Sequence, residues 1–164
     1  MSAEEEEVGT RSLEWTKEHV SDVNKEFLRG LPREIRRNVD GREVLFVHGS
    51  PRRINEYLYE DRPESSLMRM LKSLGVDCLV LGHTHLPYHR VVEGFHVVNV
   101  GSVGKQKDGD PRARYALIDF TEGISVEFRR VSYPVEDTID ALMDSGLPME
   151  LVEIFRTGGR KEIF

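Results

Sequence analysis

The segment Leu79-Val80-Leu81-Gly82-His83-Thr84-His85 is the most informative part of this 164-residue chain. Its first three residues are apolar and typical of a buried strand, and the pattern stops at a glycine and two histidines one residue apart. A strand that ends where imidazoles begin places those rings at the edge of a rigid sheet. Strand alternation would let His83 and His85 face the same way, with Thr84 turned aside.

A second apolar run, Val44 to Val47, ends in the same way at His48 and Gly49. Neighbouring strands bring their ends together, so the imidazoles of His48, His83 and His85 can meet at one rim of the sheet. Neutral imidazole is a common ligand of transition metals. The competing interpretation is structural, because a chain with six histidines can contain one such pair by chance. Spacing alone supports the two interpretations about equally.

The composition describes one ordinary globular domain, with 38% hydrophobic and 32% charged residues. The formal net charge is -6, so no general nucleic-acid binding is expected, and a polyanionic ligand needs a local positive site. Cys78 is the single cysteine, and its apolar neighbours favour a buried, inert thiol. No apolar stretch reaches membrane-spanning length and the acidic start is unlike a signal peptide, so we expect a cytoplasmic protein without a membrane partner.

Around the two apolar runs, the sequence predicts an α/β (α+β) domain. Residues 1–9 form an acidic lead that we expect to be flexible, although its glutamates also favour the start of a helix, and residues 10–164 form a single domain. The local patterns predict two helices within 10–28, the second capped by Ser21, a hairpin over 34–47 turning at Asp40-Gly41, a loop over 53–63, a helix over 64–74, a strand over 77–81, hairpins over 88–100 and 115–130, and helices over 134–145 and 148–155.

Three segments, taken in order, resemble the calcineurin-like metallophosphoesterase superfamily and are most similar to its branch of small prokaryotic phosphodiesterases. They are VLFVHGSP at 44–51, LVLGHTHLP at 79–87 and VNVGSVG at 98–104, and the resemblance extends over about residues 13–128. It implies part of a four-layer αββα sandwich with mixed and antiparallel strands, in which two divalent metals at the sheet rim promote hydrolysis of a phosphoester.

The resemblance also implies roles for individual residues. His48 and His83 match ligands of one metal, and His85 matches a ligand of the other. Gly49 and Gly82 would give close backbone access at the site. The implied cofactor is a divalent transition metal, namely Mn, Zn, Ni or Fe.

The chain also departs from the family pattern. The family's first part carries Asp-x-His, Gly-Asp-x-x-Asp and Gly-Asn-His motifs, and none of them precedes His48, so the resemblance covers the C-terminal part of the domain. Without a bridging carboxylate, we expect this chain to hold one ion or none. Substitute ligands are available in Asp77, Asn99, Asp108 and Asp110, but their contexts favour turns and solvation. No residue is assigned as catalytic.

Two further features bear on ligands and partners. Ser50 and Arg52 follow the first histidine, where an arginine can pair bidentately with phosphate, although a solvated surface role fits the pattern as well. Loss of the domain's first part would uncover apolar sheet surface or a strand edge, so we expect a homo-oligomer or a second chain that covers it.

Three functions remain open from the sequence. The first is a metal-dependent phosphoesterase, phosphodiesterase or phosphatase-like, that acts on a phosphoester small molecule and is incomplete or impaired as this chain alone. The second is a non-catalytic binding or scaffold protein of the same fold. The third is a degenerate metal-binding domain without phosphate chemistry.

Overall fold

The computed structural model describes residues 3–159, in which the chain forms two sheets. The larger sheet has the strand order β1-β2-β3-β5-β4, and β6 pairs with β7 in a separate sheet. Strands β2, β3 and β5 run parallel, whereas β1 and β4 are antiparallel edge strands. The strands are β1 (Glu34–Val39), β2 (Arg42–Val47), β3 (Cys78–Leu81), β4 (Tyr88–Val92), β5 (Phe95–Asn99), β6 (Ala113–Asp119) and β7 (Ser125–Val131).

The helices are α1 (Ala3–His19), α2 (Asp22–Arg29), α3 (Glu64–Leu71), α4 (Val135–Ser145) and α5 (Glu150–Thr157). α1 begins at Ala3, so residues 3–9 are helical where we expect a flexible lead from the sequence. The Ser21 hydroxyl caps α2 by accepting a hydrogen bond from the Asn24 amide (3.3 Å), as predicted. Within residues 3–159, no helix combines the length and the apolar character that a bilayer crossing requires.

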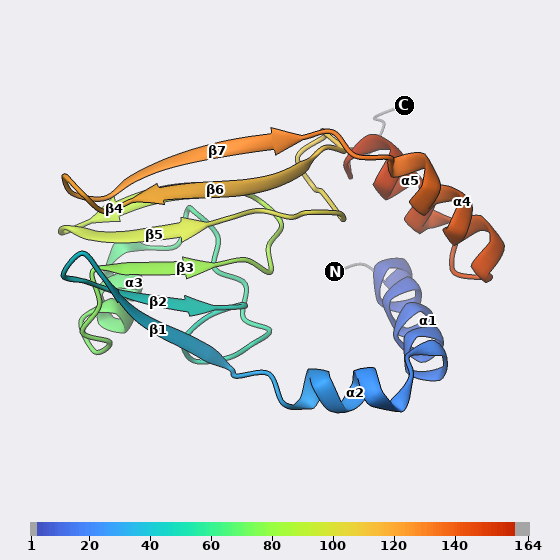
Figure 1. The fold of residues 1–164 in the computed structure, drawn as a ribbon, viewed down its shortest axis with the longest axis horizontal. Coiled ribbons are helices and arrows are strands. Elements are labelled where there is room, and N and C mark those ends of the chain that lie inside the picture. The colour runs from blue at the N-terminus through green and yellow to red at the C-terminus, as the bar shows by residue number, and fades with distance from the viewer. Residues whose placement is uncertain (1–2, 160–164) are drawn as a thin grey trace.

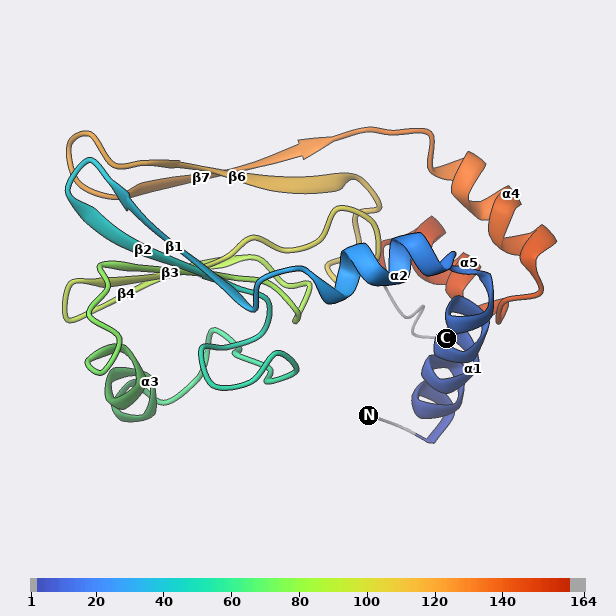
Figure 2. The ribbon, with the colours of Figure 1, turned by 60° about the horizontal axis from the view of Figure 1, so that its bottom comes forward.

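The five-stranded sheet is the middle of three layers (Figures 1 and 2). α3 covers one face, where Leu71 packs in one cluster with Leu45 and Leu79. The β6–β7 hairpin covers the other face, where Val44 and Val80 lie in a second cluster. Alternate residues of the same strands enter the two clusters because successive side chains point to opposite faces. The structure therefore confirms a mixed α/β fold.

The remaining helices do not extend this layering. In both views α1, α4 and α5 gather beyond one end of the strands, and α2 lies between them and β1 (Figures 1 and 2). The indole of Trp15 in α1 donates a hydrogen bond to the Ser145 carbonyl at the end of α4 (2.8 Å), which joins the first helix of the chain to the helices that follow β7. Residues 3–159 thus show three of the four layers implied by the sequence resemblance.

Two tight turns set the registers of the hairpins in the larger sheet. Asp40 and Gly41 both have positive φ angles (48° and 79°), as do Glu93 and Gly94 (46° and 84°). Two consecutive positive φ angles define the turn whose twist matches a two-residue hairpin. Both hairpins therefore form where the sequence predicts them.

Candidate functional site

The candidate site lies at the carboxyl ends of three parallel strands. His48 directly follows β2, Gly82 directly follows β3, and residues 100–104 follow β5. These strands are neighbours in the sheet and their arrows end on the same side in Figure 1. Loops at the carboxyl ends of parallel strands are a usual place for binding sites, because the strands hold the attached side chains rigidly.

His48 and His83 face each other across this edge. The distance between Nε2 of His48 and Nδ1 of His83 is 3.1 Å, and the ring centroids are 4.9 Å apart. Burial lowers the pKa of His83, and the neighbouring His48 lowers it further. The His83 ring is therefore neutral at neutral pH, the form that binds metals. The structure brings His48 and His83 into direct contact, two of the three histidines predicted to meet, and the charge of His83 also acts on His85.

His85 is held separately by the loop that follows β5. Its Nδ1 donates a hydrogen bond to the carbonyl of Lys105 (2.5 Å), since a carbonyl oxygen only accepts. In the neutral ring, Nε2 is then unprotonated, and its lone pair can coordinate a metal ion. Metal-binding histidines have this arrangement. Burial lowers the pKa of His85 and so favours that neutral form.

The backbone that carries His83 and His85 is not a strand. β3 ends at Leu81, and both histidines adopt left-handed φ angles, 65° for His83 and 62° for His85. The expectation that strand alternation would orient them is therefore wrong. Thr84 does turn inward, with 1% of its surface exposed, but the loop conformation places it there. Left-handed residues other than glycine persist only where surrounding contacts enforce them.

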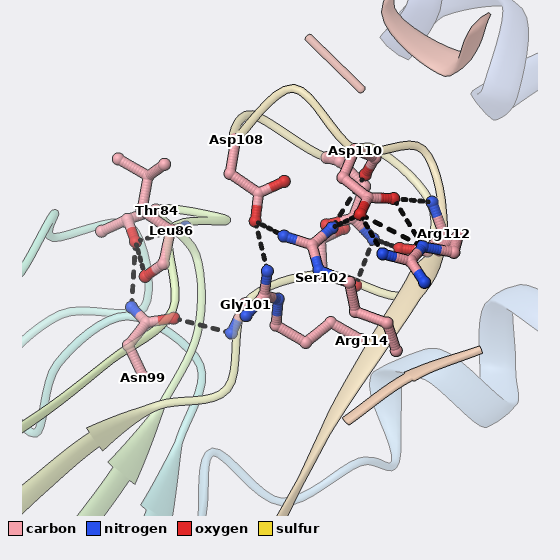
Figure 3. A network of polar contacts seen from close by, with 11 residues as sticks. Thr84, Leu86, Asn99, Gly101, Ser102, Asp108, Asp110, Arg112 and Arg114 are labelled. Carbon is pink, nitrogen blue, oxygen red and sulfur yellow. Dashed lines mark hydrogen bonds and ion pairs between the residues drawn. The ribbon is translucent and has the colours of Figure 1, made fainter. Parts of the chain in front are cut away.

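Asn99 provides those contacts (Figure 3). Its side chain is fully buried, and its Nδ2 donates to the Gly82 carbonyl (2.8 Å) and to Oγ1 of Thr84 (2.9 Å). Its Oδ1 accepts a hydrogen bond from the amide of Gly101 (3.0 Å). The Asn99 amide thus ties the histidine loop to the loop after β5. Its role is positional, and sequence reasoning considered it only as a substitute ligand.

The loop after β5 is fixed by a network of ion pairs (Figure 3). Asp108 pairs with Arg114 (2.6 Å) and Arg130 (2.8 Å), and Asp110 pairs with Arg112 (2.6 Å) and Arg130 (2.8 Å). These carboxylates are held by guanidinium groups of β6, β7 and the loop itself. They stabilise the loop that presents the Lys105 carbonyl to His85.

Ser50 and Arg52 are engaged within their own turn. The Ser50 hydroxyl donates to the carboxylate of Glu56 (2.5 Å) and accepts from the amides of Arg52 and Arg53 (both 3.1 Å). The Arg52 guanidinium also pairs with Glu56, and its Nε is 3.0 Å from the carboxylate. Both predicted phosphate-binding residues therefore have a structural role, and phosphate binding by them stays a prediction.

Gly49 and Gly82 differ in the space that a side chain would have at each position. A Cβ at Gly49 would lie 2.4 Å from the Ile54 carbonyl oxygen, so only glycine fits there. At Gly82 the nearest atom would be the His48 carbonyl oxygen at 3.8 Å, an ordinary contact. The structure thus gives Gly49 a packing reason and leaves room for a side chain at Gly82.

Two residues beside the histidines were missed by sequence reasoning. The ring of Tyr57 lies 4.3 Å from that of His83, centroid to centroid. Lys107 is exposed, and after burial its positive charge contributes to the lowered pKa of both His83 and His85. The chain's net charge of -6 gives no indication of this local positive charge. Neither residue belongs to a local motif; the one signal for Lys107 was its place in a glycine-bearing loop.

The histidines suit a divalent transition metal in type but are too few to enclose one. Two nitrogen ligands about 2.0–2.1 Å from the same ion lie roughly 3.0–3.4 Å apart, which matches the His48–His83 separation. Nε2 of His83 is buried without a hydrogen bond, although the Asn55 backbone lies near the ring. Within residues 3–159, no group of three His, Cys, Asp or Glu side chains can hold a metal ion. The described residues therefore supply part of a metal site.

Comparison with known proteins places these residues in a family. A model of the calcineurin-like phosphoesterase superfamily domain matches residues 15–123. The uncharacterized protein MJ0912 of Methanocaldococcus jannaschii is 29% identical over 162 residues, a match that covers 88% of this chain and 64% of that protein.

Solved structures agree in fold. A metallophosphoesterase from Sphaerobacter thermophilus is 30% identical, with a TM-score of 0.74, and the match covers 88% of this chain and 65% of that one. The hypothetical protein PH1004 from Pyrococcus horikoshii OT3 is 26% identical, with a TM-score of 0.72, and the corresponding shares are 83% and 54%.

The chain spans less than two thirds of the length of each of these relatives, with shares of 64%, 65% and 54%. The matched segment nevertheless includes both histidine-bearing strand ends, and the family model covers most of the chain. By sequence and by fold, the chain belongs to the calcineurin-like phosphoesterase superfamily and resembles its small prokaryotic metallophosphoesterases.

Proposed function

We propose that this chain carries the histidine part of a divalent-metal phosphoesterase centre, which hydrolyses a phosphoester small molecule once its remaining ligands are present. The observation that carries this proposal is the facing pair of His48 and His83, with 3.1 Å between their ring nitrogens at adjacent strand ends. The family of the chain and the neutral state of His83 support it.

Each residue has a defined task in this proposal. His48 and His83 hold one ion of Mn, Zn, Ni or Fe, and His85 contributes its Nε2 to a second position. When bound, such a cation neutralises charge on phosphate oxygens and lowers the pKa of water. Lys107 supplies the positive charge that attracts a phosphate to this edge of an otherwise acidic protein.

The missing donors are carboxylates in this proposal. The family motifs that carry them do not occur before His48 in the sequence, and residues 3–159 contain no complete cluster of ligands. We propose that a further polypeptide segment that carries these motifs, from the same or another chain, supplies them and covers the adjoining apolar surface. The cytoplasmic location expected from the sequence is part of the same proposal.

Metal binding and turnover test the proposal separately. The full chain is titrated with MnCl₂ in a calorimeter and assayed with bis(p-nitrophenyl) phosphate, and the His83→Ala variant is compared with His89→Ala. His89 is a matched control because its Nε2 lies 2.9 Å from Nδ1 of His96 in a similar pair on β4 and β5, outside the site. We expect His83→Ala to lose most Mn²⁺ affinity and His89→Ala to keep it.

The two readouts have different consequences. Unchanged Mn²⁺ affinity in His83→Ala would contradict the metal site. Metal binding without hydrolysis at any Mn²⁺ concentration would show that this chain alone is not an enzyme, which agrees with the need for further carboxylates.

A protein-binding role is a second candidate, favoured by one observation. None of the eight residues of α2 is buried, and Val23 and Phe27 expose 80% and 67% of their surfaces. Exposed apolar side chains on one helix are typical of a contact with another protein. If this role is correct, Phe27→Ser abolishes self-association in light scattering whether or not Mn²⁺ is present.

A further inference from the structure

Three aromatic rings lie in a row beside the histidine pair. The centroid of Tyr57 is 4.3 Å from that of His83, with 38° between the ring planes. The ring of Tyr59 stacks on Tyr57 at 5.7 Å, and their planes differ by 9°. We call His83, Tyr57 and Tyr59 the aromatic row. It begins at the candidate metal ligand and extends away from it.

The chain presents these two tyrosines outward from a firmly held loop. Leu58, between them, is 1% exposed and belongs to the core under α3. The Tyr88 hydroxyl donates a hydrogen bond to the Leu58 carbonyl (2.9 Å), which fixes the backbone at that point. Because Leu58 points inward, Tyr57 and Tyr59 point to the surface, with 41% and 46% of their areas exposed.

Positively charged groups lie at the His83 end of the row. A pocket of about 450 Å³ is lined by Arg52, Arg53, Asn55 and Glu56, just before Tyr57 in the chain. The backbone of Asn55 lies near the His83 ring, so this pocket adjoins the histidine pair. The Arg53 guanidinium forms no ion pair with any residue in the range 3–159, so it is available to an anion.

The arginine-bearing pocket and the exposed tyrosine rings therefore both adjoin His83. A phosphoryl group placed at His83 has the arginine-bearing pocket beside it and exposed phenol rings next to it. Aromatic side chains that stack bases accept any planar ring, because every such ring has a π face. Aliphatic phosphoesters would gain little binding affinity from this surface, because they have no ring to stack.

We propose that Tyr57 and Tyr59 bind a planar aromatic group of the substrate, either a nucleobase or an aryl ring, while its phosphoryl group lies at His83. This inference rests on the proposed function for the position of the phosphoryl group. It narrows the substrate class from phosphoesters in general to phosphoesters that carry an aromatic ring.

Calorimetry with three phosphates tests this inference without requiring turnover. The full chain, with MnCl₂ present, is titrated with adenosine 5′-monophosphate, phenyl phosphate and ribose 5-phosphate. We expect at least one aromatic ligand to bind roughly tenfold or more tightly than ribose 5-phosphate, the range that stacking of one ring provides. A stronger gain for adenosine 5′-monophosphate identifies a nucleobase as the ring, and a stronger gain for phenyl phosphate identifies an aryl group.

Variants locate the preference on the aromatic row. The double variant Tyr57→Leu/Tyr59→Leu should lose the preference and keep its affinity for ribose 5-phosphate. Tyr115→Leu, which changes a similarly exposed tyrosine on β6, should keep the preference.

Two results would overturn the inference. One is equal affinity of the unmodified chain for the aromatic phosphates and ribose 5-phosphate, and the other is a preference that survives in the double variant. Unchanged Mn²⁺ affinity in His83→Ala would count against the proposed function alone, because the aromatic preference is measured separately, as binding of the three phosphates.

Discussion

At the scale of single residues, Gly49 and Gly82 both adjoin histidines of the site but differ in the space around them. We expect Gly49→Ala to lower the free energy of unfolding by roughly 1–3 kcal/mol, because its Cβ would lie 2.4 Å from the Ile54 carbonyl oxygen. Gly82→Ala has 3.8 Å of room and should change the free energy by about 0.5 kcal/mol or less. Urea unfolding of the two variants measures both changes in the free energy of unfolding. Equal losses of stability in the two variants would contradict this account.

Cys78 gives a second prediction at this scale. The thiol is buried in β3, and burial raises its pKa to about 12. Because the thiolate is the nucleophile, the native protein at pH 8 should react with Ellman's reagent roughly a thousandfold more slowly than a free cysteine. One equivalent should react at once in guanidinium chloride. Rapid stoichiometric reaction of the native protein would show that β3 opens easily.

At the scale of elements, Asn99 couples the loop after β3 to the loop after β5. Asn99→Ala leaves the Gly101 amide without its partner and the Gly82 carbonyl with only its bond from the Thr84 amide, and it should cost about 1–3 kcal/mol of stability. We also expect weaker Mn²⁺ binding, because the left-handed backbone of His83 is no longer held. Thermal unfolding and calorimetry give the two values. Asn24→Ala, in exposed α2, is the control that should change neither.

The ion pairs of the β5–β6 loop predict how its stability depends on pH. The hydrogen bonds from Arg112 are the largest cause that holds the pKa of Asp110 well below its ordinary 3.8. A carboxyl group with a lowered pKa in the folded state stabilises the fold above its unfolded pKa, and that contribution is lost as the pH falls below about 4.

Asp110→Asn should therefore lower the thermal unfolding midpoint at pH 7 and have a much smaller effect near pH 2. Asp140→Asn, at an exposed position of α4, should leave the midpoint unchanged at both values. A deficit of Asp110→Asn that is equal at both pH values would show that packing, rather than charge, explains the loss.

At the scale of the whole molecule, α2 contributes apolar surface that the described chain does not bury. Replacing Val23 and Phe27 with serine should change the free energy of unfolding by about 0.5 kcal/mol or less, since neither residue is in the core. Binding of the dye ANS should fall at the same time. Leu71→Ala, in the core under α3, should instead cost roughly 2–5 kcal/mol. A large loss of stability in the α2 variant would mean that α2 already packs against another copy.

The local parts of this architecture follow from sequence signals. Asp40-Gly41 and Glu93-Gly94 set their hairpins because the positive φ angles involve only those residues. The apolar run Val44 to Val47 and the helical spacing around Leu71 likewise depend on nearby residues, so the buried strand and the helix were predictable. The two histidine-bearing strand ends were recognisable for the same reason.

The strands, the turns and the family of this protein could be recognised from the sequence, because those signals lie within short segments. The way in which the site is built depends on tertiary contacts. His48 and His83 are 35 residues apart, and Asn99 lies 17 residues from the Gly82 carbonyl that it holds. The left-handed histidine loop and the position of Tyr57 against His83 depend on such distant contacts. They form only when the sheet brings its strand ends together, so no local pattern encodes them.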